Sequence, residues 1–241
     1  MEVVKASNYE DMSKKACKKM VRVLKQNKSP VIGLATGSTP EGLYRCLIEK
    51  YKNKEITFEN TTTFNLDEYV GLTNDNPNSY HYYMDDKLFN HINIKRENVH
   101  IPSGVAENLE EECKQYEKLI QKAKRIDFQL LGLGVNGHIG FNEPGTPFSS
   151  RTHVVELDES TRNANAHFFA SGWEVPSRAI SMGIETIMES KEILLLASGE
   201  KKAYAVARLL NGEISEQFPA SILHKHENVT IIADVAALSK T

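Results

Sequence analysis

Cysteine, long apolar runs and an excess of charge of either sign are all scarce in this sequence. The three cysteines, Cys17, Cys46 and Cys113, lie far apart and form no CxxC pair, which excludes a disulfide scaffold and a zinc-finger site. No apolar run approaches the roughly 18 residues that a transmembrane helix needs, and Met1 to Lys5 lack the apolar core of a secretory signal. We therefore expect a cytoplasmic protein with reduced thiols and no membrane contact.

The balance of charge argues against nucleic acid as a partner. The chain carries 29 Lys and Arg against 32 Asp and Glu, a net charge of −3, whereas nucleic-acid binders show a basic excess or a basic stripe. The densest basic stretch, Lys14 to Lys19, has helical spacing and is interpreted as a solvated helix face.

The remaining composition is typical of one globular domain. With 241 residues, 40% of them hydrophobic, and with 14 Gly and 8 Pro, the chain is neither disordered nor collagen-like. No repeat, low-complexity tract or linker divides it, and an α/β domain commonly reaches this length. Residues 1–241 are predicted to form a single domain.

Short β-branched runs alternate with longer segments of helical period. Strands are predicted at 31–36, 61–66, 128–133, 193–198 and 229–234, with a weaker candidate at 178–182. Helices are predicted at about 8–27, 40–53, 78–91, 107–124, 158–169 and 200–211. The alternation predicts an α/β fold, in which a mostly parallel sheet carries helices on both faces. Ligands of such sheets bind beyond the carboxyl ends of the strands, where the strand order reverses.

The first predicted strand runs into Thr36-Gly37-Ser38-Thr39-Pro40 and then a helix. Gly37 permits a tight turn, Pro40 suits the first helical position, and free N–H groups at a helix start favour a phosphate. An ordinary N-cap by Thr39 is the alternative. Because the Gly-Lys-Ser/Thr of a triphosphate-binding loop is absent, a phosphate monoester fits better than a nucleoside triphosphate.

The second predicted strand ends in Asn65-Leu66-Asp67-Glu68-Tyr69. A carboxylate at the mouth of a parallel sheet can act as a general base when its neighbours tune its pKa. Adjacent acids more often cap and solvate a loop. Spacing alone leaves both interpretations open.

The third predicted strand leads into Gly132, Gly134 and Gly137, a GxGxxG pattern. A dinucleotide fingerprint has to open a helix that packs on its strand. Here Gly140, Gly145 and a proline between them interrupt any helix within two turns. No dinucleotide is predicted.

His138 lies among these glycines, with Asn136 and Glu143 close in sequence. An imidazole in this place has little apolar surface to pack against and can move protons near neutral pH. Glu143 can accept from one ring nitrogen and fix the tautomer. We favour a functional histidine over a structural one.

Two further features concern anion and metal binding. The fourth strand leads to a turn that contains Lys201 and Lys202, and a lysine there can reach the same crevice and pair with phosphate, although most lysines at helix starts are solvated. His224 and His226 are alternate residues with no carboxylate or cysteine cluster beside them. No metal site is predicted.

Five segments form a recognisable series: 34–40 (LATGSTP), 64–72 (FNLDEYVGL), 77–80 (PNSY), 136–144 (NGHIGFNEP) and 150–152 (SRT). In this order they resemble the glucosamine-6-phosphate deaminase family. The likeness spans nearly the whole chain, and the Gly-His-Ile-x-Phe-Asn-Glu-Pro block is highly specific. The resemblance implies a three-layer αβα Rossmann-like fold. It also implies a cofactor-free conversion of glucosamine 6-phosphate and water to fructose 6-phosphate and ammonia.

The resemblance also implies roles for single residues. Asp67 is the base that moves a proton from C2 to C1, and His138 opens the pyranose ring with the help of Asn136 and Glu143. Enolisation needs a fixed carboxylate, and ring opening needs a group that both donates and accepts, so these residue types suit the chemistry. The implied phosphate site comprises Thr36, Gly37, Ser38, Thr39, Lys202 and His167.

Two departures from the family concern single residues. Some members carry Asp where Asn136 stands, so the orientation of His138 is expected to depend mainly on Glu143. His167 stands where relatives place an Arg on the phosphate, and a neutral imidazole is a poorer phosphate ligand than a bidentate guanidinium. Weaker or more pH-dependent phosphate binding is therefore expected.

A third departure is length. The allosterically regulated relatives are longer at the C-terminus and carry Arg and Lys where this chain has His153 and Val155. We expect no activation by N-acetylglucosamine 6-phosphate, and a monomer or small homo-oligomer. A lid over the substrate is expected within residues 151–173.

Two alternatives stay open. A 6-phosphogluconolactonase shares the fold and the Asp-Glu pair, but has a Thr-Ala-Ser-Leu-Phe type run after its Gly-His, where this chain has Ile139 to Glu143. A sugar-phosphate-sensing module would carry a helix-turn-helix in front, yet the predicted sheet begins by Val31 and leaves room for one helix only.

Overall fold

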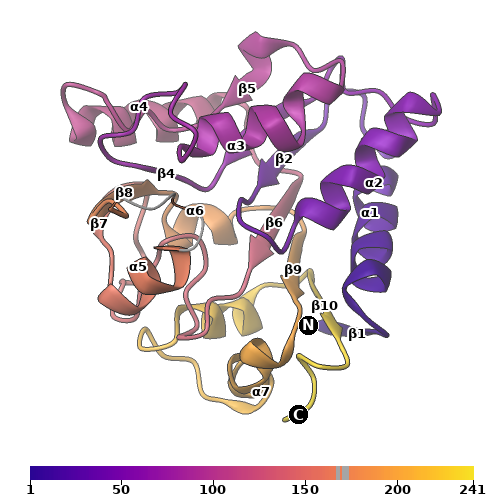
Figure 1. Ribbon diagram of the computed structural model, residues 1–241, viewed down its shortest axis with the longest axis vertical. Helices are drawn as coiled ribbons and strands as arrows, with labels where there is room; N and C mark the ends of the chain where they lie inside the picture. Colours follow the sequence, from indigo (N-terminus) through magenta and orange to yellow (C-terminus); the bar gives the residue numbers. More distant parts are fainter. Residues whose placement is uncertain (167–168, 170–173) are drawn as a thin grey trace.

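A computed structural model describes residues 1–166, 169 and 174–241 of the protein. Within those residues the core is a seven-stranded sheet in which every neighbouring pair is parallel (Figure 1). In spatial order the strands are β1 (Glu2–Ala6), β10 (Val229–Asp234), β9 (Ile193–Ala197), β6 (Phe128–Gly132), β2 (Val31–Leu34), β3 (Thr62–Asn65) and β5 (Val99–His100). The predicted α/β class is confirmed.

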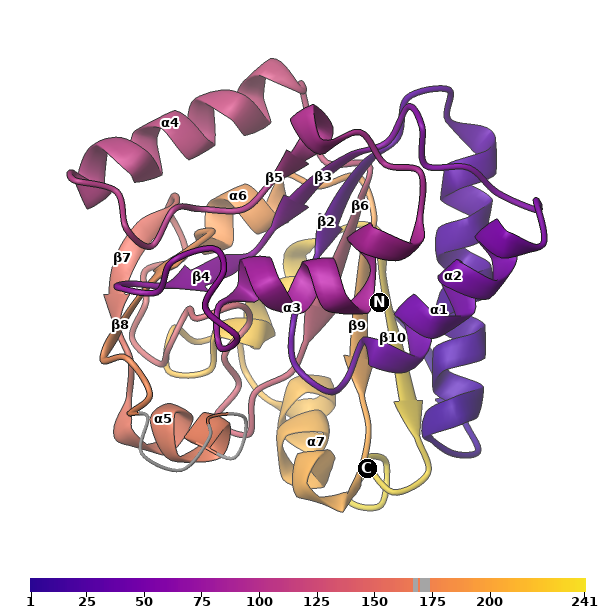
Figure 2. The ribbon, with the colours of Figure 1, turned by 45° about the horizontal axis from the view of Figure 1, so that its top comes forward.

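Helices cover both faces of this sheet. Right-handed crossovers place α1, α2 and α3 on one face and α4, α6 and α7 on the other, and Figure 2 shows α1 and α2 across the sheet from α4 and α6. These helices are α1 (Tyr9–Gln26), α2 (Glu41–Lys52), α3 (Tyr80–Lys87), α4 (Leu109–Lys122), α6 (Ile184–Met188) and α7 (Ala203–Asn211). Shorter 3-10 helices cover Phe89–His91, Arg96–Asn98, Glu200–Lys202 and Pro219–Lys225.

The first helix illustrates how the sequence sets this packing. Asn8 caps α1 by accepting a hydrogen bond from the backbone N–H of Asp11 at 2.9 Å. Met12, Ala16 and Met20 follow at helical spacing and are fully buried against the sheet. None of the described helices is long and apolar enough to cross a membrane.

The strand order reverses between β2 and β6. Ile32 of β2 pairs with Thr63 of β3 on one side and with Phe128 of β6 on the other. The chain leaves β2 over one face of the sheet and leaves β6 over the other, which opens a crevice at the carboxyl ends of these strands.

A second, antiparallel sheet was not predicted. It joins β4 (Asp67–Tyr69), β8 (Arg178–Ser181) and β7 (His153–Glu156), and the helix α5 (Glu159–Asn165) follows β7. The chain crosses into it at Leu66, whose N–H still donates to the main sheet at Leu34 while its carbonyl accepts from Met182. A small core backs this sheet and contains Tyr69, Leu72, Phe141, Leu157, Val175 and Ala179.

The expected start of the main sheet is wrong. The sequence analysis placed it at Val31, but β1 (Glu2–Ala6) precedes α1 and pairs with β10. This edge strand is mostly exposed and flanked by charges, so it lacks the continuous apolar pattern by which buried strands are detected. The segment that precedes Val31 in the sequence thus forms a strand and a helix of the main domain, β1 and α1.

Candidate active site

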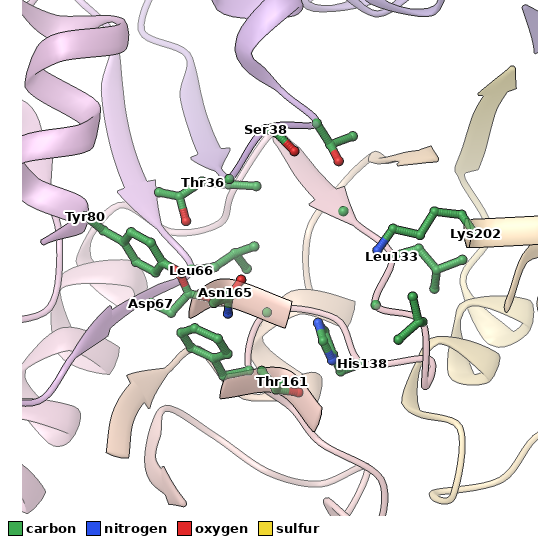
Figure 3. Close-up of a pocket in the computed structure, with 18 residues that line it drawn as sticks. Thr36, Ser38, Leu66, Asp67, Tyr80, Leu133, His138, Thr161, Asn165 and Lys202 are labelled. Atoms are coloured by element: carbon green, nitrogen blue, oxygen red, sulfur yellow. The ribbon is translucent and has the colours of Figure 1, made fainter. Parts of the chain in front are cut away.

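The crevice at the strand reversal holds a cavity of about 240 Å³. Its lining comes from the segments that follow β2, β3, β6 and β9, together with α3 and α5, as Figure 3 shows. Sites of this kind commonly bind small ligands. Among the predicted site residues, those that line it are Thr36, Gly37, Ser38, Thr39, Asp67, His138 and Lys202.

Asp67 is the first residue of β4 and points its carboxyl group into the cavity (Figure 3). Only 6% of the residue is exposed. Burial, and next the negative charge of Glu68, raise the pKa of Asp67 to about 8. A carboxylate with such a pKa is a much stronger proton acceptor than an exposed one.

Glu68 points away from the cavity, because successive residues of a strand point to opposite faces, but it is fully buried and so does not solvate a loop as the alternative interpretation had it. Its carboxylate accepts from the backbone N–H groups of Tyr80 and His81, both at 3.0 Å, at the start of α3. Glu68 therefore caps a helix, while Asp67 stays in the cavity.

His138 and Glu143 lie close together in the loop that follows β6. Nδ1 of His138 lies 3.5 Å from Oε2 of Glu143. Asn136 donates from Nδ2 to the same Oε2 at 2.9 Å, and its Oδ1 accepts from the backbone N–H of His138 at 3.2 Å. Glu143 thus lies beside the ring without a hydrogen bond to Nδ1, and Asn136 holds Glu143 and the backbone of His138.

Glu143 keeps its negative charge in this arrangement. The residue is 5% exposed. Burial acts to raise the pKa of Glu143, but the side chains of His138, Thr161 and Asn136 outweigh it and lower the pKa below its ordinary value. An ionised carboxylate next to the ring stabilises a protonated imidazole.

Gly134 makes room for this histidine. A Cβ atom at Gly134 would lie 2.4 Å from three atoms of the His138 ring, whereas one at Gly132 would meet nothing within 4 Å. Of the GxGxxG glycines, Gly134 therefore makes room for His138 and Gly137 for Phe218, and no helix begins in this loop.

The loop after β2 carries the predicted phosphate-binding residues. Gly37 has φ +86, a conformation that favours glycine. The hydroxyls of Tyr83 and Tyr9 donate to the carbonyl oxygens of Gly37 at 2.6 Å and Ser38 at 2.9 Å. These bonds turn the carbonyls away and leave the loop's N–H groups for a ligand.

The alternative N-cap role of Thr39 is wrong. Pro40 occupies the N-cap position of α2 and makes no side-chain cap hydrogen bond. The hydroxyl of Tyr9 accepts from the N–H of Gly42 in the first turn at 2.8 Å. The N–H groups of Glu41 and Leu43 remain for another partner, which an anion can supply.

Lys202 ends a 3-10 helix after β9 and reaches into the cavity from the side opposite Tyr80 and Asp67 (Figure 3). Burial lowers the pKa of its ammonium group, and no carboxylate of the described residues pairs with it. The segment before it is fixed by Asp234, which accepts from the hydroxyl of Ser198 at 2.5 Å. A half-buried cation without a carboxylate partner among the described residues, in one cavity with the loop after β2, is suited to an anionic ligand.

Several lining residues had no predicted role. Tyr80, Phe141, Thr161 and Asn165 all line the cavity. Tyr80 belongs to the PNSY segment that the sequence analysis singled out, but nothing in its spacing shows that α3 brings it beside Asp67. Thr161 and Asn165 come from α5, whose place over the cavity depends on the second sheet.

Two expectations from the sequence fall on residues that the structure does not describe. They are the phosphate-binding role of His167 and part of the lid at 151–173.

His224 and His226, the alternate histidines near the C-terminus, point to different places. Their rings bond different backbone carbonyls, those of Leu209 and Ser190.

Comparison with known proteins places the chain. Residues 5–232 match the family described as glucosamine-6-phosphate isomerases/6-phosphogluconolactonase. The chain belongs to this family. Within the family it is 59% identical over 238 residues to a glucosamine-6-phosphate deaminase of Oceanobacillus iheyensis, covering 99% of this chain and 95% of that one. It is 53% identical over 239 residues to glucosamine-6-phosphate deaminase 1 of Bacillus subtilis, covering 99% of each.

Solved structures of the family agree with the fold. A monomeric glucosamine-6-phosphate deaminase superposes with a TM-score of 0.98 at 53% identity, over 100% of both chains. A 6-phosphogluconolactonase from Thermotoga maritima gives a TM-score of 0.76 at 22% identity, over 97% of this chain and 99% of that one. The second likeness shows the shared fold alone.

Proposed function

We propose that this protein is a glucosamine-6-phosphate deaminase, which converts glucosamine 6-phosphate and water to fructose 6-phosphate and ammonia. One observation carries the proposal. A single cavity holds a buried acid of raised pKa, Asp67, a histidine paired with a carboxylate, His138, and an unpaired lysine beside a helix start, Lys202. The relatives at more than 50% identity bear the same name.

The phosphate end of the substrate is assigned to the loop after β2. The N–H groups from Gly37 to Thr39 and the first turn of α2 are oriented for an anion. Lys202 adds a positive charge, and its electrostatic attraction to a phosphate is stronger in the crevice than in bulk water. Thr36, Ser38 and Thr39 add hydroxyl groups at the same wall of the cavity.

Ring opening is assigned to His138. Opening a hemiacetal moves one proton from the C1 hydroxyl and delivers one to the ring oxygen, so a group that accepts and then donates is needed. Glu143 stabilises the charged imidazolium between these two transfers. Asn136 keeps Glu143 in place through the 2.9 Å bond.

Isomerisation is assigned to Asp67. In the open aldehyde, Asp67 removes the C2 proton while the aldehyde oxygen takes up a proton and the ammonium group gives one up, which forms an enolamine. Asp67 then delivers its proton to C1, which leaves a protonated carbon–nitrogen double bond at C2. Water then adds at C2 and ammonia departs. The ammonium group on C2 of the incoming substrate favours the ionised form of Asp67, so binding prepares the base.

The proposal also covers the assembly, the domain organisation and the cellular location of the protein. The similarity to a monomeric deaminase supports a monomer as the working form. The continuous main sheet supports a single catalytic unit with the smaller sheet as part of it. Cytoplasmic location stays a prediction from the sequence.

Ammonia release tests the proposal. Purified protein should release ammonia from glucosamine 6-phosphate and form fructose 6-phosphate in equal amount, while Asp67→Asn should do neither. The parent protein should not accelerate the hydrolysis of 6-phosphogluconolactone beyond its spontaneous rate. Lactone hydrolysis without ammonia release would assign the chain to the other activity of its family.

A further inference from the structure

Glu68 is a fully buried carboxylate that the proposed reaction does not use directly. It is 0% exposed. Oε1 accepts from the backbone N–H groups of Tyr69 at 2.8 Å and Tyr80 at 3.0 Å. Oε2 accepts from the backbone N–H of His81 at 3.0 Å and contacts Nδ1 of the same residue at 2.8 Å. Four nitrogen atoms thus surround one carboxylate and fix its orientation.

This carboxylate connects two parts of the cavity. Through β4 it is the direct neighbour of Asp67, and through α3 it holds the first helical residue, Tyr80. The ring of Tyr80 lines the cavity, its hydroxyl donates to that of Tyr69 at 3.3 Å, and the ring stacks on Phe141 at 6.1 Å. The position of Glu68 is therefore linked to the positions of both Asp67 and Tyr80.

Few groups compensate the charge of Glu68. From α3 it is faced by His81 and by the backbone N–H of Tyr80, and from its own strand by Asp67 and Tyr69. The residue opposite it on β8 is Ile180, which is apolar and buried. Within the described chain, no Lys or Arg forms a salt bridge with it, so its negative charge acts on Asp67.

We propose that Glu68 is a positioning residue for the proton transfer, which fixes a carboxylate directly beside Asp67 on β4 and whose hydrogen bonds hold Tyr80 against the substrate. His81 is the side chain that keeps Glu68 in this place. The inference rests on the proposed function for its role in the reaction. The two carboxylates divide the work, since one is fully hydrogen-bonded and charged and the other is left free in the cavity.

The experiment titrates Asp67 without substrate. The carboxyl carbon of Asp67 is followed by NMR from pH 4 to pH 10 in the parent, in Glu68→Gln and in Glu59→Gln, with Asp67→Asn to assign the signal. Glu59 is exposed and gives the same chemical change elsewhere. Glu68→Gln should lower the pKa of Asp67 by about one unit or more, and Glu59→Gln should leave it unchanged. An unchanged pKa in Glu68→Gln would overturn the inference.

Kinetics of the deamination provide the second measurement. In Glu68→Gln the rise of kcat/KM with pH should move to lower pH by the same amount, and kcat above pH 8 should fall about tenfold because the base is weaker. His81→Leu should lower kcat several-fold, and His81→Asn, which keeps a donor, should restore it. Equal kcat in His81→Leu and the parent would contradict the role of His81.

Failure of the two proposals can be told apart. A parent protein that releases no ammonia would refute the proposed function, yet the titration would still show whether Glu68 controls Asp67. Should Glu68→Gln fail to fold, the comparison of His81→Leu with His81→Asn decides the inference on its own, because both keep Glu68.

Discussion

The pKa of Asp67 links the stability of this protein to pH. Burial and the charge of Glu68 raise that pKa from 3.8 to about 8, so between these values the folded chain keeps a proton that the unfolded chain releases. The free energy of unfolding must therefore fall as pH rises, by ~1.4 kcal/mol per pH unit from this group alone. Asparagine does not titrate. From pH 5 to pH 8, Asp67→Asn should gain on the order of 4 kcal/mol relative to the parent.

Urea unfolding of parent and variant at pH 5, 6, 7 and 8 measures this difference. Groups that titrate alike in both proteins cancel in the subtraction, so the remaining slope belongs to Asp67. Glu59→Gln, at an exposed carboxylate, serves as the control and should show a flat difference. A change of less than about 1 kcal/mol for Asp67→Asn across this range would refute the reasoning, because it would mean that Asp67 is ionised in the folded protein throughout.

Three further predictions follow from the cavity. Gly134→Ala should lower kcat about a hundredfold, since its Cβ would meet the His138 ring at 2.4 Å, and parental kinetics in this variant would contradict the packing role. Lys202→Met should raise KM for the phosphorylated substrate about tenfold to a hundredfold through loss of a charged hydrogen bond, and equal KM values would contradict the phosphate assignment. The kcat/KM of the parent should rise with pH to a plateau with an inflection near 8, where Asp67 becomes ionised; a profile that is flat from pH 6 to pH 9 would argue against Asp67 as the base.

Much of the main sheet was predictable from sequence. Buried parallel strands are continuous apolar runs, and the predictions at 31–36, 61–66, 128–133, 193–198 and 229–234 all match strands of the sheet. The strands that escaped prediction are short or exposed. They are β1 and β5 at the two edges of the main sheet, and β4 and β7 in the antiparallel one.

The site was partly predictable for a related reason. Residues directly after strands meet at one edge of a parallel sheet, so Asp67, His138 and Lys202 could be expected in one crevice. Their division of roles could not be read from spacing. That Asp67 faces the cavity and Glu68 faces α3 depends on the register of β4 against β8, in which Asp67 pairs with Ser181. Register between distant segments leaves no local signal.

The positions of cavity residues on α3 and α5 were even less predictable from the sequence. Tyr80 reaches the cavity because Glu68 binds the start of its helix. Thr161 reaches it because β7 leads the chain back over the crevice before α5 begins. Both placements arise from contacts between segments that are far apart in sequence, which no periodicity records.

The central claim is that Asp67 transfers the proton at C2 of an amino-sugar phosphate. Its most direct test follows the hydrogen itself, with glucosamine 6-phosphate converted in D₂O and deuterium at C1 of the fructose 6-phosphate measured by NMR. The parent should incorporate deuterium at C1 in those turnovers in which the proton on Asp67 exchanges with solvent before it is delivered. Asp67→Asn, shown by titration still to bind the substrate, should incorporate none and release no ammonia. Incorporation by Asp67→Asn at a rate within about tenfold of the parent would contradict the claim, because loss of the proton-transferring group should cost at least a hundredfold.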